Sequence, residues 1–454
     1  MWIAEGFIPQ QQNKTMEHTA EMFLKDLVQR SMILVSKRDS DGSIKRCRIH
    51  DVLHDLAIKK AREENFLVVF PTVDAVQNCR ETRRLAIHDT RPLSEQPCGE
   101  LLASAVPKLR SLFYLGQVPN ISQLVRLKVL NNLGDDSYYY QPNNFGKLSQ
   151  LRYVQLDLKV GEKNTKYFGK FIGDMRFLQT LNLGQKVDCE LPDCVWHIIT
   201  LRHVLFYPSW SWTSGPPSSI DLTHLQTLSG VHSRESWAAQ GAPKLPNVTI
   251  LGIVFLKESQ WDATIILLDT MKHLISLNIT GWIPLKIIDM RRFPFYAHLQ
   301  NLYLDQYNVD TEKHPNQIAL DVGMLPKYLI KLELIQIKFK DDPIPVLEKL
   351  ENLRFLNLQG SELLRLCCST GGFSQLEKLI LRDLDKLEEW TTEEGAMPRL
   401  KKLKIMNCHE LHVPLGLQYL TVLQELQWMD SEISETKENE ISNICKHVPS
   451  VLIF

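Results

Sequence analysis

One spacing of leucines recurs along most of this chain and constrains its fold more than any other feature. The stretch 351–360, ENLRFLNLQG, places Leu353, Leu356 and Leu358 in the pattern L-x-x-L-x-L. The middle position of this pattern can be followed from Leu85 to Leu426, which is 341 residues in 14 steps, a mean period of about 24. So steady a period over so many copies is not a chance run of leucines.

The spacing has a direct physical reading. Its last two leucines, two residues apart, lie on one face of a short strand, and the first reaches the same core from the preceding turn. One such unit cannot bury its apolar face, but a stacked neighbour covers it. We therefore predict an α/β fold, a leucine-rich repeat solenoid of about 15 irregular repeats over residues 83–454. Its curved parallel sheet should line the concave side, with irregular or helical segments on the convex side.

Composition excludes several classes of protein. The net charge is −1 over 454 residues, so no global field favours nucleic acid or an anionic membrane. The sequence contains no apolar run of about 18 residues, as a transmembrane helix requires, and its N-terminus does not resemble a signal peptide. Nine cysteines without a C-x-x-C pair predict no metal site and favour a reducing compartment, the cytosol or nucleus. Neither G-x-S-x-G nor H-E-x-x-H occurs, so we predict no catalytic residues and no enzyme.

The first seventy residues follow a different pattern. Residues Glu17–Arg30 place apolar side chains at helical spacing, after Thr15 as a candidate N-cap. Two strands, Met32–Val35 and Ile44–Ile49, flank a polar turn, and a second helix starts at Asp51. Helix, hairpin and helix form the closing portion of a winged-helix domain, in which the hairpin is the wing.

Three segments in this region carry a specific resemblance. They are Trp2–Ile8 (WIAEGFI), Leu27–Ile33 (LVQRSMI) and Cys47–Ile58 (CRIHDVLHDLAI). They resemble plant NB-LRR disease-resistance proteins of the coiled-coil class, where such segments close the ARC2 region before the repeats. The resemblance extends over nearly the whole chain. It implies a winged-helix (ARC2-like) domain at 1–70, a connector at 71–82 and the repeats at 83–454.

Ile49-His50-Asp51 matches the family's Met-His-Asp motif, and its two polar residues have two interpretations. From sequence alone, Asp51 caps the second helix and His50 is a hinge residue. The resemblance implies instead that His50 contacts the β-phosphate of ADP at a helix N-terminus, and that Asp51 supports His50.

The phosphate-binding string G-x-x-x-x-G-K-[ST] does not occur in this sequence. We therefore expect no cofactor for this chain alone, and ADP or ATP only in a full-length receptor. We expect the chain to be the C-terminal part of such a receptor, through a shortened gene model or a genuine truncation.

Two groups of cations are candidate partner-binding residues. They are expected to alternate with the core leucines on the concave side: Arg83, Arg84 and Arg110 at the start, and Lys378, Arg382, Lys401, Lys402 and Lys404 in the later repeats. They are either solvated charges or docking sites, the later group for an acidic ligand and the earlier group for the receptor's own NB-ARC domain. The cations of the wing do not indicate DNA binding, because residues 1–70 contain 11 Lys/Arg and 10 Asp/Glu.

The resemblance implies an intracellular plant immune receptor. Its repeats would recognise a pathogen effector, or a host protein that the effector modifies, and would restrain an ADP/ATP-dependent switch. The alternative is a truncated repeat protein without nucleotide binding, acting as an interaction scaffold, an adaptor or a decoy. A winged helix that binds DNA is a third, less favoured possibility. The expected location is cytoplasmic, with nuclear or peripheral membrane association also open.

Overall fold

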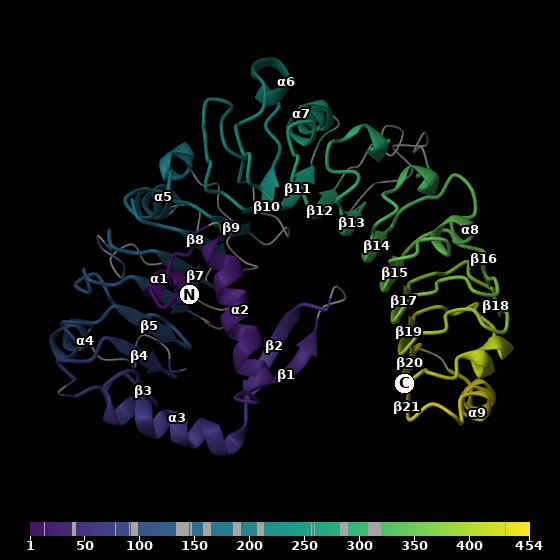
Figure 1. Cartoon of the computed structure of the whole chain (residues 1–454), viewed down its shortest axis with the longest axis horizontal. Helices are drawn as coiled ribbons and strands as arrows, with labels where there is room; N and C mark the ends of the chain where they lie inside the picture. The colour runs from purple at the N-terminus through teal and green to yellow at the C-terminus, as the bar shows by residue number, and fades with distance from the viewer. Residues whose placement is uncertain are drawn as a thin grey trace. The chain divides into compact units, whose positions relative to one another are not determined.

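The structure is a computed structural model of the chain (Figure 1). It describes all residues except 13, 39–41, 78, 90, 92–98, 133–144, 146–147, 158–164, 185–191, 207–212, 256, 258, 282–288, 307–318 and 432. The chain divides into two compact units. Unit 1 comprises Met1–Arg38 and Ile44–Val248, and unit 2 comprises Asp39–Ser43 and Thr249–Phe454.

Unit 1 contains the two helices and the hairpin that the sequence predicts, preceded by a short helix, α1, that was not predicted. The elements are α1 (Trp2–Glu5), α2 (Met16–Gln29), β1 (Ile33–Arg38), β2 (Ile44–Ile49) and α3 (Asp51–Glu63). Thr15 caps α2, because its Oγ1 accepts a hydrogen bond from the backbone N–H of His18 at 3.2 Å. Strands β1 and β2 pair antiparallel, from Ile33 opposite Ile49 onward. Asp41, expected in the hairpin turn, lies outside the described residues.

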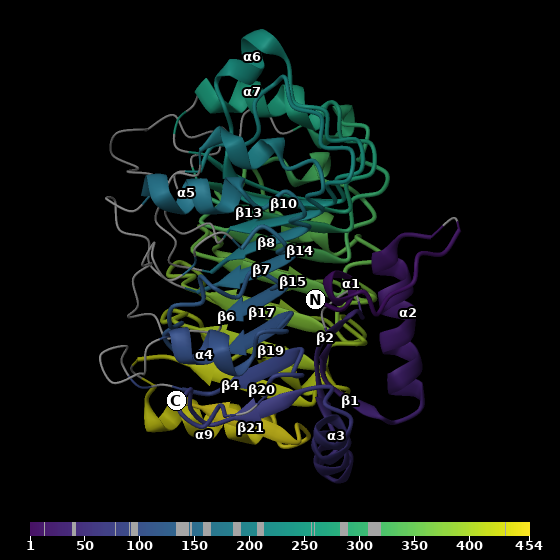
Figure 2. The same cartoon turned by 90° about the vertical axis from the view of Figure 1, so that its left-hand side faces the viewer.

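A parallel sheet follows in unit 1, in which each strand pairs with the next in the sequence. Figure 2 shows β4, β6, β7 and β8 lying one above the next. The strands are β3 (Val68–Phe70), β4 (Arg84–Ile87), β5 (Ser111–Tyr114), β6 (Val129–Asn132), β7 (Tyr153–Leu156), β8 (Thr180–Leu183), β9 (His203–Phe206) and β10 (Thr227–His232). Short helices on the return segments are α4 (Gly99–Ala105), α5 (Thr165–Gly173), η4 (Asp193–His197) and α6 (Ser236–Gln240).

Unit 2 repeats this arrangement with nine strands paired in parallel. They are β11 (Ile250–Phe255), β12 (Ser276–Gly281), β13 (Asn301–Asp305), β14 (Lys331–Ile335), β15 (Phe355–Gln359), β17 (Lys378–Arg382), β19 (Lys402–Met406), β20 (Glu425–Met429) and β21 (Ser450–Ile453). A separate two-stranded parallel sheet joins β16 (Arg365–Cys368) to β18 (Glu389–Thr392). The return segments carry α7 (Ser259–Leu268), η6 (Met290–Arg292), η7 (Val322–Met324), α8 (Ile344–Leu347), η8 (Leu415–Tyr419) and α9 (Glu435–Ile444).

The leucine pattern builds the core as predicted. Leu353, Leu356 and Leu358 are 0%, 1% and 0% exposed, and the same positions are buried in the neighbouring repeats. Asn132 takes one of these core positions with only 2% exposure. Its Nδ2 donates to the carbonyl oxygens of Tyr114 and Gly116, at 3.2 and 2.9 Å. A polar residue is therefore stable at a leucine position because it satisfies two backbone acceptors of the preceding repeat.

The sheet begins earlier than we expected. The predicted boundary after residue 70 separates β3 from β4, yet Val68, Val69 and Phe70 pair in parallel with β4. That boundary placed the run before Pro71 in the winged-helix domain. A first strand needs no full repeat pattern, because it covers only one neighbour.

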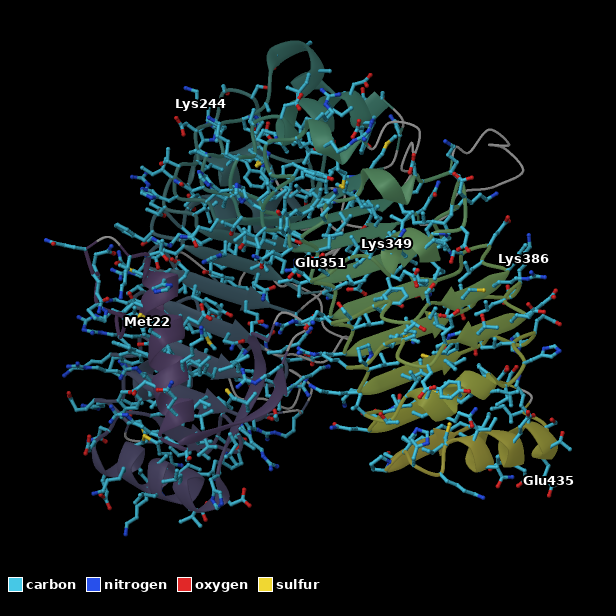
Figure 3. The ribbon with its side chains drawn as sticks, turned by 45° about the vertical axis from the view of Figure 1, so that its right-hand side comes forward. Met22, Lys244, Lys349, Glu351, Lys386 and Glu435 are labelled. Atoms are coloured by element: carbon cyan, nitrogen blue, oxygen red, sulfur yellow. The ribbon has the colours of Figure 1, made fainter. Side chains whose placement is uncertain are left out.

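The side chains that alternate with the core residues form what we call the open face of each sheet. The opposite side of unit 2 carries the return segments, where Lys386 points away from the sheet (Figure 3) and pairs with Glu362 at 3.4 Å. In the part of the chain that the structure describes, no helix is long and apolar enough to cross a membrane.

Candidate functional site

The N-terminal helices of unit 1 dock on the open face of its own sheet. Glu5, at the end of α1, accepts a hydrogen bond from Nε of Arg84 on β4 at 3.0 Å and another from the hydroxyl of Ser111 on β5. The side chains of Arg84 and Glu5 are only 16% and 6% exposed. This ion pair is therefore shielded from solvent, and the charge of each partner is compensated by the charge of the other.

Two aromatic rings complete the Arg84 contact. The guanidinium carbon of Arg84 lies 4.7 Å from the ring centre of Phe7 and 4.5 Å from that of Phe66, and the two rings stack at 5.7 Å. Phe7 follows α1, whereas Phe66 lies between α3 and β3. A planar cation that contacts two rings and a carboxylate links three segments of the chain in one cluster.

Apolar contacts continue the docking surface across the sheet. Ala4 of α1 is 3% exposed and clusters with Val129 on β6 and Tyr153 on β7, with Phe113 packed beside them. Burial raises the pKa of Tyr153 to about 12. Its neutral hydroxyl donates to Oε1 of Gln155 at 2.7 Å.

A second polar contact, which we call the Glu17 latch, joins the first turn of α2 to β9 and β10. Glu17 accepts two hydrogen bonds from the guanidinium of Arg202, at 2.7 and 2.6 Å, and one from the amide of Gln226 at 3.1 Å. Nε2 of His203 lies 3.3 Å from the same carboxylate. Burial alone would raise the pKa of Glu17, but the hydrogen bonds from His203, Arg202 and Gln226 outweigh it and lower that pKa well below its ordinary value. The latch therefore favours the ionised carboxylate.

Three of the predicted open-face cations lie elsewhere, and the prediction was wrong for them. Arg83, Arg110 and Lys401 each immediately precede a strand and share the parity of the core leucines rather than of the open face. The carbonyl oxygen of each residue accepts hydrogen bonds from two consecutive backbone N–H groups of the next repeat. The carbonyl oxygen of Arg83, for example, accepts from Arg110 and Ser111 at 2.8 and 3.0 Å. Their side chains are exposed at the sheet edge, where Lys401 pairs with Glu377 at 3.2 Å.

The edge cations of unit 1 crowd one another. Burial lowers the pKa of Lys128, and repulsion from Arg152 and Arg110 lowers it further, against a smaller opposing effect of Glu5. Lys128 and Arg152 occupy the same pre-strand position as Arg110, in the next two repeats. An acidic partner beside this edge would relieve the repulsion.

Four predicted cations do lie on the open face of unit 2, on β17 and β19. The Nζ atom of Lys378 lies 5.1 Å from the ring centre of Phe355, and Nη2 of Arg382 donates to the sulfur of Met406 at 3.1 Å. Lys402 pairs with Glu425, and this hydrogen bond, together with the charges of Lys402, Lys404 and Lys378, lowers the pKa of Glu425 against its burial. The cations therefore outnumber the acid that they share.

His50 and Asp51 lie at the start of α3, and both are exposed. His50, not Asp51, is the N-cap: its Nδ1 accepts from the backbone N–H of Val52 at 3.3 Å, and Asp51 is the first helical residue. The assignment of Asp51 as the cap was wrong, because the imidazole fills that role. One imidazole at an exposed helix end does not form a nucleotide cradle, so ADP does not fit these residues alone.

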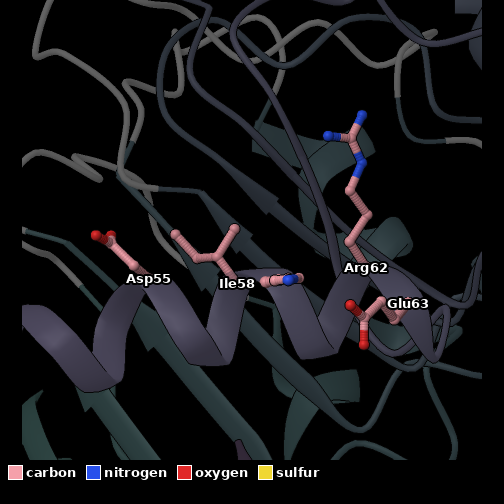
Figure 4. Close-up of a pocket in the computed structure, with 5 residues that line it drawn as sticks. Asp55, Ile58, Arg62 and Glu63 are labelled. Atoms are coloured by element: carbon pink, nitrogen blue, oxygen red, sulfur yellow. The ribbon is translucent and has the colours of Figure 1, made fainter.

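Further along α3, an open groove follows one face of the helix (Figure 4). It is lined by Asp55, Ile58, Lys59, Arg62 and Glu63, and all of these residues belong to α3. The described part of α3 buries none of its residues. The groove offers two acids and two cations on a single helix, without a second wall to enclose a ligand.

Replacing Asp51 with valine separates the switch interpretation from a structural one. Asp51 interacts favourably with the α3 dipole, which is worth only about 0.3–1 kcal/mol at an exposed position, so this chain should remain folded. In a receptor that also contains a nucleotide-binding module, we expect Asp51→Val to cause cell death in leaves without pathogen, and the control Asp55→Val to remain silent. An Asp51→Val receptor that accumulates normally and stays silent would contradict the switch role.

Sequence reasoning missed the acidic half of the docking site. Glu5 and Glu17 were not singled out, nor were Arg202, His203 and Gln226. Glu5 offered one clue, as the only charged residue within the apolar segment WIAEGFI. The Glu17 latch joins residues 185 positions apart, for which a single sequence carries no sign.

Comparisons with known proteins agree with this architecture. A family model described as "Leucine-rich repeat region" matches residues 108–448. A second, "Disease resistance protein Winged helix domain", matches residues 1–57. The two models match the docked segment and most of the repeats, and residues 58–107, which include β3 and β4, lie between the two matches.

Relatives of similar sequence come from Arabidopsis thaliana. The chain is 28% identical to the probable disease resistance RPP8-like protein 2, over 94% of this chain and 47% of that protein. It is 27% identical to disease resistance protein RPP8, with the same coverage, and 29% identical to disease resistance protein RPP13, over 89% of this chain and 44% of that protein. The chain spans about half the length of these relatives. It belongs to the leucine-rich repeat family, and it carries the winged-helix domain of plant disease-resistance proteins before its repeats.

Proposed function

We propose that this chain is the sensing part of a plant immune receptor, which acts by binding rather than by catalysis. Its repeats would bind a pathogen effector or a modified host protein. Until then they would hold the winged-helix segment against the sheet of unit 1. In a receptor that also contains the nucleotide-binding module which the family resemblance implies, this docking would restrain an ADP/ATP-dependent switch.

The docking of α1 and α2 on the open face is the observation that carries this proposal. The same face of a repeat array is its usual binding surface, and here the chain's own N-terminal segment covers part of it. The contact rests on two polar clusters, Glu5 with Arg84 and Glu17 with Arg202. A surface held by a few charged pairs can be released by a partner that binds the open form more tightly.

The crowded cations at the edge of unit 1 support the same proposal. Arg110, Lys128 and Arg152 would gain from an acidic surface beside them. The receptor's own NB-ARC domain is one partner that could supply it. The excess of cations on β17 and β19 offers a second basic surface, suited to an acidic ligand.

A charge exchange in the Glu17 latch tests the restraint. In a receptor that contains this chain and a nucleotide-binding module, Arg202→Glu places two carboxylates together and should release α2, giving cell death in leaves without pathogen. The double variant Glu17→Arg with Arg202→Glu restores an opposite-charge pair and should return the receptor toward silence. If Arg202→Glu accumulates normally and remains silent, the latch does not restrain the receptor.

A further inference from the structure

A small polar hollow lies on the open face of unit 2, beside the cations of β17 and β19. It has a volume of about 170 Å³ and spans three strands. The register sets Ser276, Asn301 and Lys331 in one row across β12, β13 and β14, with Asn278, Tyr303 and Glu333 in the next row. Every one of these outward side chains can form hydrogen bonds, so the hollow can bind a polar group.

One acceptor in this hollow has no partner. Oδ1 of Asn301 is buried from solvent without a hydrogen bond, and so is Oδ1 of Asn357 on β15, beside Glu333 in the register. A buried acceptor without a donor opposes folding, because it has lost its water and gained nothing in return. Because Oδ1 of Asn301 is closed to water, a ligand can use this amide as an acceptor only if the amide turns over, which exchanges its oxygen and nitrogen.

The charges of the hollow are already balanced. Nζ of Lys331 pairs with Oε1 of Glu333 at 2.8 Å, and Nδ2 of Asn357 donates to the other carboxylate oxygen at 3.1 Å. Lys331 also lies 5.3 Å from the ring centre of Phe355, which fixes its position. An added carboxylate would face Glu333 and an added guanidinium would face Lys331, so an uncharged ligand group is favoured.

The neighbours Asn301 and Lys331 offer an acceptor and a donor side by side. Lys331 has three N–H groups, and Glu333 accounts for one of its contacts. A carboxamide carries N–H donors and a carbonyl acceptor in one plane, so it complements this pair. It also pairs with the Asn301 amide in either orientation of that amide, since both groups donate and accept.

We infer that this hollow is a subsite for a carboxamide side chain, Asn or Gln, of a polypeptide bound on the open face of unit 2. The inference rests on the proposed function, namely that the repeats bind a partner protein. It adds the chemical class of one residue that the partner presents. The cations of β17 and β19 lie three and four strands from β13 in the sheet order, so an acidic residue of the same partner segment could reach them.

Selection of random linear peptides on the purified full chain tests this subsite. We expect the enriched peptides to share an Asn or Gln at a fixed position. Replacing that residue with leucine should weaken binding to the chain by about tenfold, the contribution of one buried hydrogen bond. The same peptide change should have no effect on binding to the Asn301→Leu variant, because the two changes remove one interaction. Asn352→Leu, an exposed asparagine before β15, is the control and should behave like the unchanged chain.

Thermal unfolding separates a binding role from a structural one. If Asn301 serves a ligand, Asn301→Leu should melt at an equal or higher temperature, because the change removes an unpaired buried acceptor. A lower melting temperature would show that Asn301 stabilises the fold, and would overturn the proposal. Enriched peptides that bind through acidic residues and share no carboxamide would show that the hollow does not bind Asn or Gln. That result would overturn this inference but not the proposal that the repeats bind a partner. Failure to enrich any peptide would contradict both.

Discussion

Replacing Arg84 with alanine should detach α1 from the repeats. The change leaves Glu5 with a side chain that is 6% exposed and without its cation, and such uncompensated burial costs about 3–5 kcal/mol. The stacked rings of Phe7 and Phe66 also lose the cation that contacts both of them, which adds about 0.5–1 kcal/mol or more. We expect amide exchange in residues 2–7 to accelerate by about a hundredfold or more, measured by hydrogen exchange with mass spectrometry.

The neighbouring residue provides a matched control. Arg83 carries the same charge but is exposed at the sheet edge, so Arg83→Ala should leave exchange in residues 2–7 unchanged. Arg84→Lys keeps the charge but loses the planar group that contacts both rings, and should give an intermediate result. Equal exchange in the Arg83→Ala and Arg84→Ala variants would show that the buried ion pair does not hold α1.

The repeat array could be predicted from the sequence because its physics is local. Leu353, Leu356 and Leu358 need only a strand and a neighbour of the same kind to be buried, and both requirements recur with a fixed period. The hairpin of β1 and β2 was likewise predictable from its own residues. Where the period was broken, at Asn132, the reason is a hydrogen bond to the preceding repeat that no periodicity reveals.

The positions of the charged residues were predicted less well. Alternation along a strand assigns residues to faces only within that strand, so Arg84 lies on the open face whereas Arg83 and Arg110 lie before their strands. The error arose from extending the alternation one residue too far. The N-cap of α3 was assigned to the wrong residue because Asp is a far more frequent N-cap than His. In the structure His50 occupies the N-cap position, and Asp51 follows it inside the helix.

The docking site could not be predicted from the sequence because its contacts are not periodic. Glu5 meets Arg84, 79 positions away, and Glu17 meets Arg202, 185 positions away. Each pair forms only because the repeats first build a surface on which α1 and α2 can lie. The restraint that we propose is therefore a property of the assembled repeats and not of any local motif.

Acidification should weaken the Glu17 latch. The pKa of Glu17 is lowered in the docked state from an ordinary value of 4.5, so the latch is at full strength above that value and is lost as the pH falls through the docked-state pKa. Exchange in the first turn of α2, corrected for the intrinsic rate at each pH, should be constant near neutrality and should increase steadily below about pH 4.5.

Three variants assign this effect to Glu17. In Glu17→Gln the exchange should be faster at neutral pH, and its difference from the unchanged chain should shrink as the pH falls, because the unchanged carboxylate becomes neutral as well. Glu21→Gln changes an exposed acid on the same helix, which pairs with Lys25 at 2.8 Å, and should follow the unchanged chain. His203→Gln keeps a hydrogen-bond donor beside Glu17, so exchange in this variant should still increase as the pH falls below about 4.5. A profile that is identical for the Glu17→Gln variant and the unchanged chain would assign the pH dependence to another group.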